Sequence, residues 1–402
     1  MITLYNKESD CCGCGACEAI CPKANIKMIT AGDGGYFFPK YLGDDNCINC
    51  ELCLKVCPMK HLVPKHEASF EPVFMAGYTN DSDLWRKSSS GGAFTEICEA
   101  NKEKQPVVFG ARWEEFEVVM DYNEKGDTEC FRKSKYVEAN PKQNYSKVKS
   151  FLENGRFVIY SGTPCQINGL YAFLRKCYDK LLTIDFACHG QGSPVVFRKW
   201  LQHLEKQYGK PLVAFKLREK IIVKDHINSN CTTYEFVDGT SITTTRDYYH
   251  HAYVKGLHMR KSCANCGFAA NRLADITLAD FKNVREGWPE ALSERNISTI
   301  ICNTEKGYDA VKRIKNMTMK ESNKDFVLKY NPKLNKGLPG NPLRDSFIKY
   351  VLNNGVWVSI KKYCRILPSE WVEYNCSEKF RTNTVKVCRF FDWIALRIYR
   401  LL

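Results

Sequence analysis

The sequence predicts a multidomain protein of the α+β or α/β class, with a small cysteine-rich domain, a larger mixed domain and a helical carboxyl-terminal extension. The chain has 402 residues, roughly two to three times the usual length of one domain. Nine of its 21 cysteines lie in the first 62 residues. Strand-like and helix-like segments then alternate from Val73 to about Asn335, as expected for a mixed or parallel sheet.

The composition indicates a folded cytoplasmic protein. Hydrophobic residues make up 44% and charged residues 26% of the chain, which is ordinary for a globular protein. No apolar run reaches the roughly eighteen residues that a membrane span needs. The amino terminus lacks the charged start and apolar run of a secretory signal, so we expect a reducing compartment, where disulfides are rare.

The formal net charge of +14 is unevenly distributed. Residues 341–402 carry eleven Lys and Arg against five Asp and Glu, whereas the first sixty residues are close to neutral. The basic residues have no nucleic-acid-reading motif around them, so no nucleic-acid partner is expected. In residues 384–402, aromatic and apolar side chains are interleaved with arginines, which fits either a helix packed on protein or peripheral contact with a membrane surface.

Two cysteine runs in the first domain share the spacing C-x2-C-x2-C-x3-C followed by proline. Three thiolates separated by two residues wrap a loop around one 4Fe-4S cube, and the fourth, before proline, turns away to ligate the other cube. The spacing therefore predicts a bacterial ferredoxin-like domain with two cubes over residues 1–62. The predicted ligands of one cube are Cys11, Cys14, Cys17 and Cys57, and those of the other are Cys47, Cys50, Cys53 and Cys21.

Zinc and disulfides are the alternative uses of these cysteines. Structural zinc pairs two C-x2-C knuckles around one ion and has no need for an exchanged cysteine before proline. Disulfides belong to oxidising compartments, which the amino terminus does not indicate. Gly13, Gly15 and Ala16 fit close approach of the backbone to a cube, whose sulfides can accept from N–H groups. The spacing favours iron–sulfur cubes and leaves Cys12 without a role.

A polar, proline-containing stretch follows the first domain, and we predict a linker over residues 63–72. The mixed domain is divided into an amino-terminal part, 73–160, and a carboxyl-terminal part, 161–335. Its predicted strands include VVFGARW, FVIYSG and LLTIDFA, and its predicted helices include GGAFTEICEANKEK and PVVFRKWLQHLEKQYG. The basic and aromatic residues 336–402 form the predicted helical extension.

Four further cysteines lie in turns rich in small residues: Cys165 in SGTPCQ, Cys188 in ACHG, and Cys263 and Cys266 in CANC. Two of them have the C-x2-C spacing, and thiols presented by loops suit metal ligation. Buried free cysteines that pack as small hydrophobes are the alternative. The other cysteines beyond residue 62 lack such settings and are expected to be core or surface thiols.

The segment SSSGGAF, residues 88–94, opens a helix-like stretch, so glycines and hydroxyls gather at a helix amino terminus. Such a terminus binds phosphate, because its free N–H groups and the positive end of the helix dipole face the anion. A helix that is only capped by serine is the alternative. The residues alone leave both interpretations open.

These blocks resemble the beta subunits of coenzyme F420 hydrogenases and dehydrogenases, a family that includes ferredoxin-dependent hydroxymethyl-chlorophyll reductases. SSSGGAF, SKYVEA at 134–139, SGTPCQ, ACHG, and CANC followed by LADITLADF at 273–281 occur in order. The resemblance covers roughly residues 1–310, including the ferredoxin-like domain. One departure is Ala279-Asp280, where the family usually has Gly-Asp, so close backbone contact there is less certain.

The resemblance implies a third 4Fe-4S cluster and an FAD. Family members without the ferredoxin-like domain keep the four later cysteines and carry one cube, so Cys165, Cys188, Cys263 and Cys266 are the implied ligands. Arg218 and Lys220 match a basic family position that could meet a flavin phosphate or an acidic substrate, with a solvated charge run as the alternative. The implied flavin-binding residues are Ser89, Ser90, Gly91, Gly92 and Thr95 at the diphosphate, and Ser134, Lys135 and Tyr136 nearby.

The combination predicts an iron–sulfur flavoprotein oxidoreductase. Cubes pass single electrons, deazaflavins and nicotinamides exchange hydrides, and a flavin converts between the two. Electrons would move between a ferredoxin-like or deazaflavin donor or acceptor and a substrate; the alternative is a non-catalytic relay subunit that feeds a partner oxidoreductase subunit. The sequence identifies neither the substrate nor a catalytic residue. His189 could donate a proton or be structural, and His250 and His251 lack ligand-like spacing.

Overall fold

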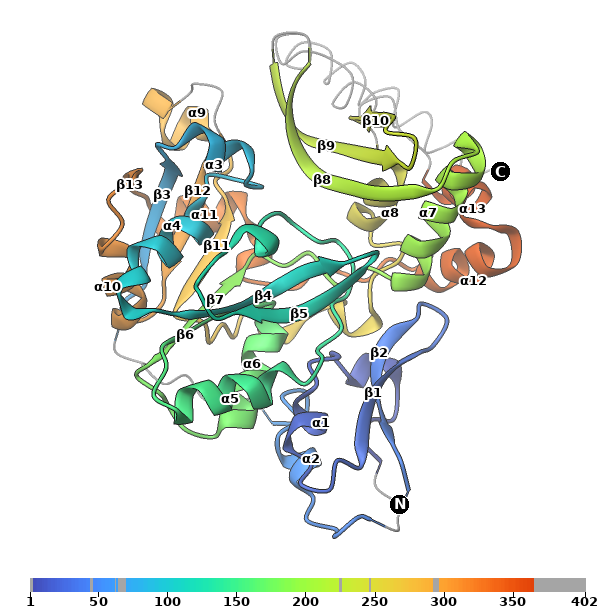
Figure 1. Ribbon diagram of the computed structural model, residues 1–402, viewed down its shortest axis with the longest axis horizontal. Helices are drawn as coiled ribbons and strands as arrows, with labels where there is room; N and C mark the ends of the chain where they lie inside the picture. Colours follow the sequence, from blue (N-terminus) through green and yellow to red (C-terminus); the bar gives the residue numbers. More distant parts are fainter. Residues whose placement is uncertain are drawn as a thin grey trace.

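The computed structural model describes residues 3–43, 46–61, 63, 70–223, 226–245, 247–291 and 296–364. Figure 1 shows three units: a small amino-terminal domain, a large sheet with helices on both faces, and a smaller antiparallel sheet with its own helices. The small domain lies beside α5 (Asn144–Glu153) and α6 (Pro164–Leu174) of the large unit.

The small domain repeats one pattern, in which a cysteine run leads into a short helix. The 3-10 helix η1 (Glu8–Asp10) precedes the first run, which continues into α1 (Ala16–Ile20), and the second run surrounds α2 (Leu52–Lys55). Gly15, directly before α1, has a φ of +83°, a left-handed conformation that glycine adopts without steric cost. Between the runs, the antiparallel hairpin consists of β1 (Ile26–Ala31) and β2 (Tyr36–Tyr41).

Eight strands form the large sheet, in the order β13-β3-β12-β11-β7-β6-β4-β5. The central strands run parallel: β4 (Val107–Glu114), β6 (Val158–Ser161), β7 (Leu181–Phe186) and β11 (Ile276–Asp280). The flanking strands pair antiparallel: β5 (Glu117–Asn123), β12 (Ser298–Cys302), β3 (Val73–Thr79) and β13 (Met317–Glu321). The carboxyl ends of the central strands therefore meet at one edge, where open α/β sheets bind ligands.

Helices cover both faces of the large sheet. Val107 and Phe109 of β4 pack in the core formed with α5 and α6, whereas Val108, between them, packs in the core formed with α4 (Ala93–Ala100) and α10 (Glu305–Lys312). Successive side chains of a strand point to opposite faces, so a strand that is covered on both sides needs a continuous apolar run. This explains the apolar sequences VVFGARW and LLTIDFA.

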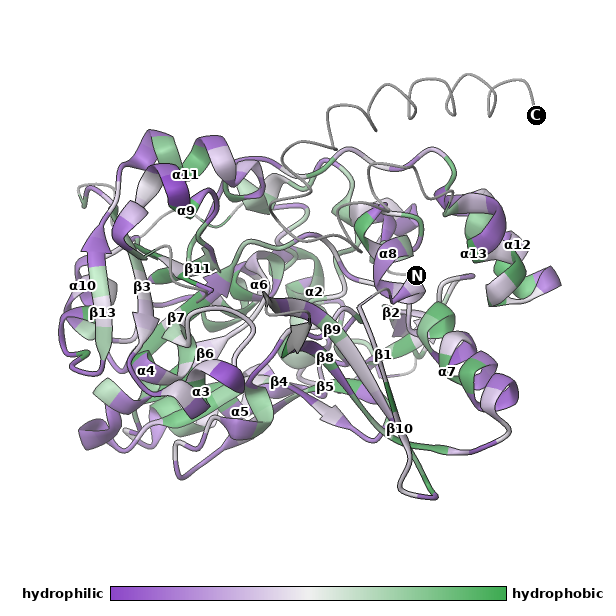
Figure 2. Ribbon diagram, turned by 90° about the horizontal axis from the view of Figure 1, so that it is seen from above, coloured by the Kyte–Doolittle hydropathy of each residue, from purple (hydrophilic) through white to green (hydrophobic). Residues whose placement is uncertain are grey.

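The third unit is an antiparallel sheet in the order β10-β9-β8 with four helices that share one core. Its strands are β8 (Leu212–Val223), β9 (His226–Phe236) and β10 (Ser241–Thr244). Its helices are α7 (Pro194–Tyr208), α8 (Tyr248–Val254), α12 (Arg344–Asn354) and α13 (Val356–Tyr363). Figure 2 shows hydrophobic and hydrophilic residues alternating along α7, α12 and α13, as expected for helices with one buried face.

Short elements connect these units. They are α3 (Ser82–Arg86), η2 (Lys102–Lys104), η3 (Glu129–Phe131), η4 (Lys261–Cys263), η5 (Gly267–Ala269), α9 (Val284–Gly287), η6 (Pro289–Ala291), α11 (Lys324–Tyr330) and η7 (Pro332–Leu334). Among the described helices, none has the length and apolar character of a membrane span.

The fold confirms a separate cysteine-rich domain and a mixed α/β domain, and the strands expected at VVFGARW, FVIYSG and LLTIDFA are β4, β6 and β7. The antiparallel sheet β8–β10 lies inside the range 161–335, which we predicted to be a single α/β part. Helices α12 and α13 lie in the predicted extension, and its later residues, including 384–402, lie outside the described residues. The exact domain boundaries stay predictions.

Candidate functional site

The cysteines of the two amino-terminal runs lie in two mixed groups. Burial raises the pKa of Cys17, and the nearby thiols of Cys11 and Cys57 raise it further. Burial likewise raises the pKa of Cys53, and Cys21 adds to that rise. Cys57, from the second run, therefore lies close to the first run, and Cys21, from the first run, lies close to the second. Ligation of iron by these side chains stays a prediction.

The chemistry around the second group fits an iron–sulfur cube. Its four cysteines border one small cavity, and the Asn25 main-chain N–H donates to Cys21 Sγ at 3.3 Å. Such bonds stabilise sulfur that carries negative charge. Within the described part of the chain, no three His, Cys, Asp or Glu side chains converge closely enough to hold a single metal ion. The ligands of a cube bind separate iron atoms and therefore need not converge on one point.

In the part of the chain that the structure describes, none of the cysteines of the three predicted cluster sites is joined in a disulfide. A disulfide framework is therefore absent from this part of the chain. Cys98 is buried and Cys130 is exposed, in line with the core and surface roles expected for cysteines outside the motifs.

The parallel sheet brings together the four cysteines predicted to hold the third cube. Cys165 lies in the first turn of α6, directly after β6, and Cys188 follows β7. Cys263 ends η4, and Cys266 precedes η5. Burial raises the pKa of Cys263, and the thiols of Cys188, Cys165 and Cys266 raise it further, so the four side chains lie near one another.

Polar groups point at these thiols. The Gln191 main-chain N–H donates to Cys263 Sγ at 3.3 Å, and the Gln191 side-chain amide donates to Cys165 Sγ at 3.6 Å. Thr163 Oγ1 lies 3.1 Å from Cys165 Sγ. Donors of this kind stabilise thiolates bound to iron. The donor set therefore fits a 4Fe-4S cube.

A cavity of about 550 Å³ lies next to these cysteines. Its wall includes Cys188 and His189, and also residues 88–90, 92–95 and 131–137. The volume falls in the range of about 300–1,000 Å³ that is usual for small-molecule and cofactor sites. The predicted cube site and the cavity thus share a wall.

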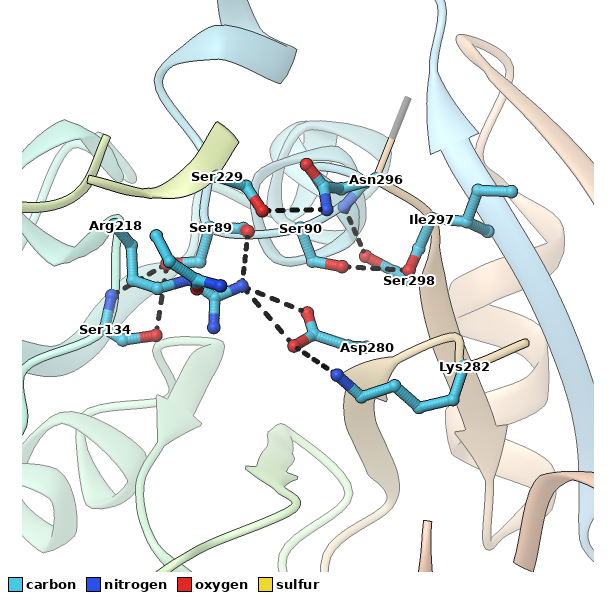
Figure 3. A network of polar contacts seen from close by, with 12 residues as sticks. Ser89, Ser90, Ser134, Arg218, Ser229, Asp280, Lys282, Asn296, Ile297 and Ser298 are labelled. Carbon is cyan, nitrogen blue, oxygen red and sulfur yellow. Dashed lines mark hydrogen bonds and ion pairs between the residues drawn. The ribbon is translucent and has the colours of Figure 1, made fainter. Parts of the chain in front are cut away.

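Serine side chains anchor the SSSGGAF segment to its neighbours, as Figure 3 shows. The Ser134 N–H donates to Ser89 Oγ at 2.8 Å, and Ser90 Oγ donates to the Ile297 carbonyl oxygen at 2.9 Å. Ser89 connects the segment to residues 131–137, and Ser90 connects it to the chain before β12. The hydroxyls hold the shape of this part of the cavity wall.

The two glycines of this segment are required by space and by conformation. A Cβ at Gly91 would lie 2.4 Å from the Gly77 carbonyl oxygen and 2.7 Å from the Ser298 main-chain nitrogen. Gly92 begins α4 with a φ of +90°, which side chains other than glycine rarely adopt. The amino terminus of α4, whose first N–H groups lack helical partners, therefore starts at the cavity wall.

Two family comparisons match different parts of the chain. Residues 155–325 match the C terminus of the coenzyme F420 hydrogenase/dehydrogenase beta subunit. Residues 10–61 match the 4Fe-4S dicluster domain. The chain therefore carries a 4Fe-4S dicluster domain near its amino terminus and, behind it, a domain of the coenzyme F420 hydrogenase/dehydrogenase beta subunit type. The dicluster match confirms the prediction of two 4Fe-4S clusters near the amino terminus, and the two matches together indicate an iron–sulfur component of an electron-transfer oxidoreductase.

No curated protein matches this chain. Among solved structures, it is similar to a chain in a xenon-derivatised F420-reducing [NiFe] hydrogenase complex from Methanosarcina barkeri. The two chains share 14% sequence identity, and the match covers 77% of this chain and 96% of the other, with a TM-score of 0.42. A TM-score below 0.5 does not establish a common fold.

The ammonium of Lys135 is bound by carbonyl groups of the neighbouring main chain. Its ammonium donates to four carbonyl oxygens of residues 130–133 at 2.7–3.4 Å, and burial lowers its pKa to about 7. Tyr136 Oη accepts from Arg218 Nη1 at 3.2 Å, and Thr95 Oγ1 accepts from Arg132 Nε at 3.1 Å. A diphosphate contact by Lys135 would need its carbonyl bonds to be exchanged.

Arg218 and Lys220 hold the SSSGGAF segment from β8. Arg218 Nη2 donates to the Ser89 carbonyl oxygen at 2.9 Å and pairs with Asp280 at 3.4 Å (Figure 3). Lys220 Nζ donates to the Ser90 carbonyl oxygen at 2.6 Å. Burial, together with the charge of Arg218, lowers the pKa of Lys220 to about 7. These two residues are partly buried at the segment, and the interpretation as a solvated charge run is wrong.

Three ring side chains complete the cavity wall, and α8 brings two of them. His250 and Tyr253 lie on α8, and His189 contacts Tyr253 with ring centroids 5.0 Å apart. Burial lowers the pKa of His189 to about 4 and that of His250 to about 3, so both are neutral at pH 7. Sequence reasoning left His250 unassigned, because only the fold brings α8 to the cavity.

Proposed function

We propose that this protein is an iron–sulfur flavoprotein oxidoreductase that moves electrons between a ferredoxin-like or deazaflavin donor or acceptor and a substrate. One observation carries the proposal: Cys188, a predicted ligand of the third cube, lines the same cavity as the SSSGGAF segment. A cofactor bound in that cavity would lie directly beside the cube site.

The cavity wall suits the diphosphate of FAD. The amino terminus of α4 offers N–H groups, Gly91 and Gly92 leave the backbone open, and Arg218 adds positive charge beside Ser89. When bound, the flavin would supply the exchange between single electrons and hydrides. The residues proposed to hold it are Ser89, Ser90, Gly91, Gly92 and Thr95, with Ser134, Lys135 and Tyr136 beside them.

The neutral histidines of the wall are proposed to shape the rest of the cavity. At pH 7, His189 and His250 add no charge next to Cys188, because burial holds both rings neutral. The charges of the wall come instead from other side chains, among them Arg218 and Lys333, whose ammonium lies beside His189. An anionic cofactor is proposed to place its diphosphate at the amino terminus of α4, where the helix dipole favours negative charge.

The first test is anaerobic purification of the full chain, followed by analysis of iron, acid-labile sulfide and flavin. Three cubes predict about twelve iron atoms per chain, since each cube contains four, and the proposal adds one FAD. Fewer than two cubes, or no flavin, would contradict the proposal. Colourless protein that binds zinc stoichiometrically would overturn the iron–sulfur account as a whole.

A matched pair of variants tests the cavity. Arg218→Gln removes a charge at the proposed diphosphate site, and we expect about tenfold weaker FAD binding, which corresponds to about 1.4 kcal/mol. Arg313→Gln removes an exposed arginine that pairs with Glu103 and is the control. Equal flavin retention in both variants would place the diphosphate elsewhere.

The redox partner is tested by reducing the flavin with three donors, compared side by side: reduced ferredoxin, a reduced deazaflavin and a reduced nicotinamide. We propose that electrons are exchanged with ferredoxin or with a partner oxidoreductase subunit, in the cytoplasm. If the flavin is absent or covered while the clusters still reduce a partner subunit, the protein is a non-catalytic relay subunit instead.

A further inference from the structure

One arginine joins the small domain to the large unit at the point where two predicted cluster loops meet. Arg260 lies three residues before Cys263, and its side chain is fully buried. The guanidinium reaches into the small domain, where Nε donates to the Cys11 carbonyl oxygen at 2.8 Å and Nη1 donates to the Phe37 carbonyl oxygen at 3.0 Å. Arg260 therefore connects a loop of the third cube directly to a loop of the first.

A buried carboxylate balances this arginine. Glu138 Oε1 lies 2.6 Å from Arg260 Nη1, and its side chain is only 1% exposed. Glu138 Oε2 accepts from the Phe37 N–H at 2.9 Å, and the Glu138 N–H donates to the Gly192 carbonyl oxygen at 2.9 Å. Arg260 Nη2 has no partner among the described residues. The pair is held rigidly, and its positive end faces the cysteine loops.

The two cysteine loops are in contact beside this pair. The Cys12 thiol, which lies outside the regular cysteine spacing, is within hydrogen-bonding reach of the thiols of Cys14 and Cys165. A Cβ at Gly169, on α6, would lie 2.9 Å from Cys14 Sγ, and a Cβ at Gly13 would lie 2.9 Å from Arg260 Nη1. The glycines allow this close approach. The inner ferredoxin site therefore adjoins the site of the third cube.

The charge of Arg260 acts on both sites. Burial raises the pKa of Cys11, and the Arg260 charge opposes that rise; it also acts electrostatically on Cys12 and Cys263. A buried positive charge stabilises added negative charge on either side of it, because the low-dielectric interior screens it weakly. Reduction of a cube adds one negative charge.

We propose that Arg260, balanced by Glu138, is a positioning residue that sets the reduction potentials of the inner ferredoxin cube and the third cube together. This inference rests on the proposed function, since it assumes that both cubes exchange electrons. It also predicts the order in which the sites exchange electrons. The inner cube, with Cys11, Cys14, Cys17 and Cys57, is the one that exchanges a single electron with the third cube, and the outer cube is left for the external partner.

The alternative is an ion pair that only holds the two units together. Buried ion pairs are often structural, and removing one partner is destabilising in either case. A change in stability therefore cannot separate the two roles. A change in reduction potential can, because a purely structural pair would leave the potentials of intact cubes unchanged.

The experiment is a redox titration of the anaerobically purified full chain, followed by electron paramagnetic resonance so that each cube is observed separately. The variants are Arg260→Gln, Arg260→Lys and Glu138→Gln, each with its iron content measured. The titration is run at about pH 8.5, where Glu138 is ionised even though burial raises its pKa to about 7. The control is Arg272→Lys, because Arg272 is paired with Asp185 and acts on Cys188 and Cys266, within the third site alone.

The expected shifts have opposite signs. Arg260→Gln removes the positive charge and lowers the midpoint potentials of two cubes, whereas Glu138→Gln leaves that charge unbalanced and raises both. Arg260→Lys keeps the charge and stays closer to the wild type than Arg260→Gln. Arg272→Lys leaves both ferredoxin cubes unchanged.

Wild-type potentials in Glu138→Gln protein with a full iron content would overturn the inference, and so would a shift confined to the third cube. If Arg260→Gln protein does not fold, the midpoint potentials of Glu138→Gln protein alone decide between an effect of charge and a purely structural ion pair. A wild-type chain with only two cubes overturns this inference alone, whereas fewer than two cubes or no flavin contradicts the proposed function instead. The two failures are therefore distinguishable.

Discussion

The two kinds of cysteine site in this protein are built in opposite ways. The eight predicted cluster ligands of the small domain lie within 47 residues, from Cys11 to Cys57, and each run leads into a helix of four or five residues. The four predicted cluster ligands of the large unit are spread over 102 residues, from Cys165 to Cys266. They meet only because β6 and β7 are parallel neighbours.

This difference shows which part of a site depends on local sequence and which part depends on the fold. A cube in the small domain depends mainly on its own cysteine loops. The third cube needs a correctly formed sheet, because β6 and β7 place Cys165 and Cys188 side by side. Substitutions can test whether the two kinds of site are separable, from the largest expected effect to the smallest.

The largest effect is expected from Cys188→Ala. The variant should lose the third cube and about one third of its iron, four atoms of about twelve, while the cubes of the small domain remain. Iron and sulfide analysis, with spectroscopy of the remaining cubes, checks this. Cys98→Ala, a buried cysteine outside both sites, is the control and should keep all its iron. Loss of all iron in Cys188→Ala protein would show that the sites are not separable.

Acid should destabilise the third unit, which contains the antiparallel sheet β8–β10, before the small domain. Burial lowers the pKa of His258 to about 4; its Nδ1 faces the Ser193 N–H at 3.4 Å and its Nε2 faces the Tyr249 carbonyl oxygen at 3.2 Å. Folding therefore favours the neutral ring of His258 over the protonated ring. Its contribution is full above about pH 6.5 and is lost as the pH falls towards 4, which amounts to about 2 kcal/mol between pH 7 and pH 5.

Urea unfolding followed by tryptophan fluorescence measures this effect, because all seven tryptophans lie beyond residue 62. His258→Gln should reduce the loss of stability between pH 7 and pH 5. His61→Gln, at an exposed position in the small domain, should leave the loss unchanged. An equal pH dependence in both variants would assign the acid sensitivity to other groups.

The contact between the small domain and α6 of the large unit should be sensitive to a single methyl group. Gly169→Ala places a Cβ 2.8 Å from Cys14 Cβ, and such overpacking costs about 1–3 kcal/mol. We expect a lower thermal midpoint and faster loss of iron from the inner cube to a chelator. Gly267→Ala, where the added methyl meets no atom within 4 Å, should match the wild type in both measurements.

The smallest effect is expected at a helix cap. Ser193 Oγ accepts from the Val196 N–H at the start of α7 and donates to the Gly34 carbonyl oxygen of the small domain at 2.6 Å. Ser193→Ala should cost about 1 kcal/mol and should also speed iron loss from the inner cube. Thr304→Ala removes a cap of α10 with a similar cost and should not change that rate. Equal rates in the two variants would remove Ser193 from the contact between the units.

The sequence predicted the parts of the molecule that local spacing controls. The doubled cysteine run identified the dicluster domain, and the apolar runs identified β4, β6 and β7, because strands covered on both faces need continuous apolar sequence. SSSGGAF indicated a helix start, and α4 begins after Gly92. The sheet β8–β10 was missed, since its strands lie between helices and the alternation was interpreted as one α/β part.

The remaining site residues depend on contacts between distant segments. Lys135 follows a serine in a family block, yet its ammonium is held by carbonyls of the preceding turn. Arg260 lies near a cysteine pair with no spacing signal of its own, and its partner Glu138 is 122 residues away. Neither result could be obtained from a pattern along the chain, because each depends on how the fold closes around a buried charge.

The position of Cys188 in the cavity wall limits how this site can diverge among relatives. As a proposed iron ligand, Cys188 cannot change to suit a new substrate, so the cube fixes that side of the cavity. The serine segment is fixed in turn by the proposed flavin. New substrates are therefore expected to be accommodated by substitutions at wall residues that serve neither group, with the route for electrons left intact.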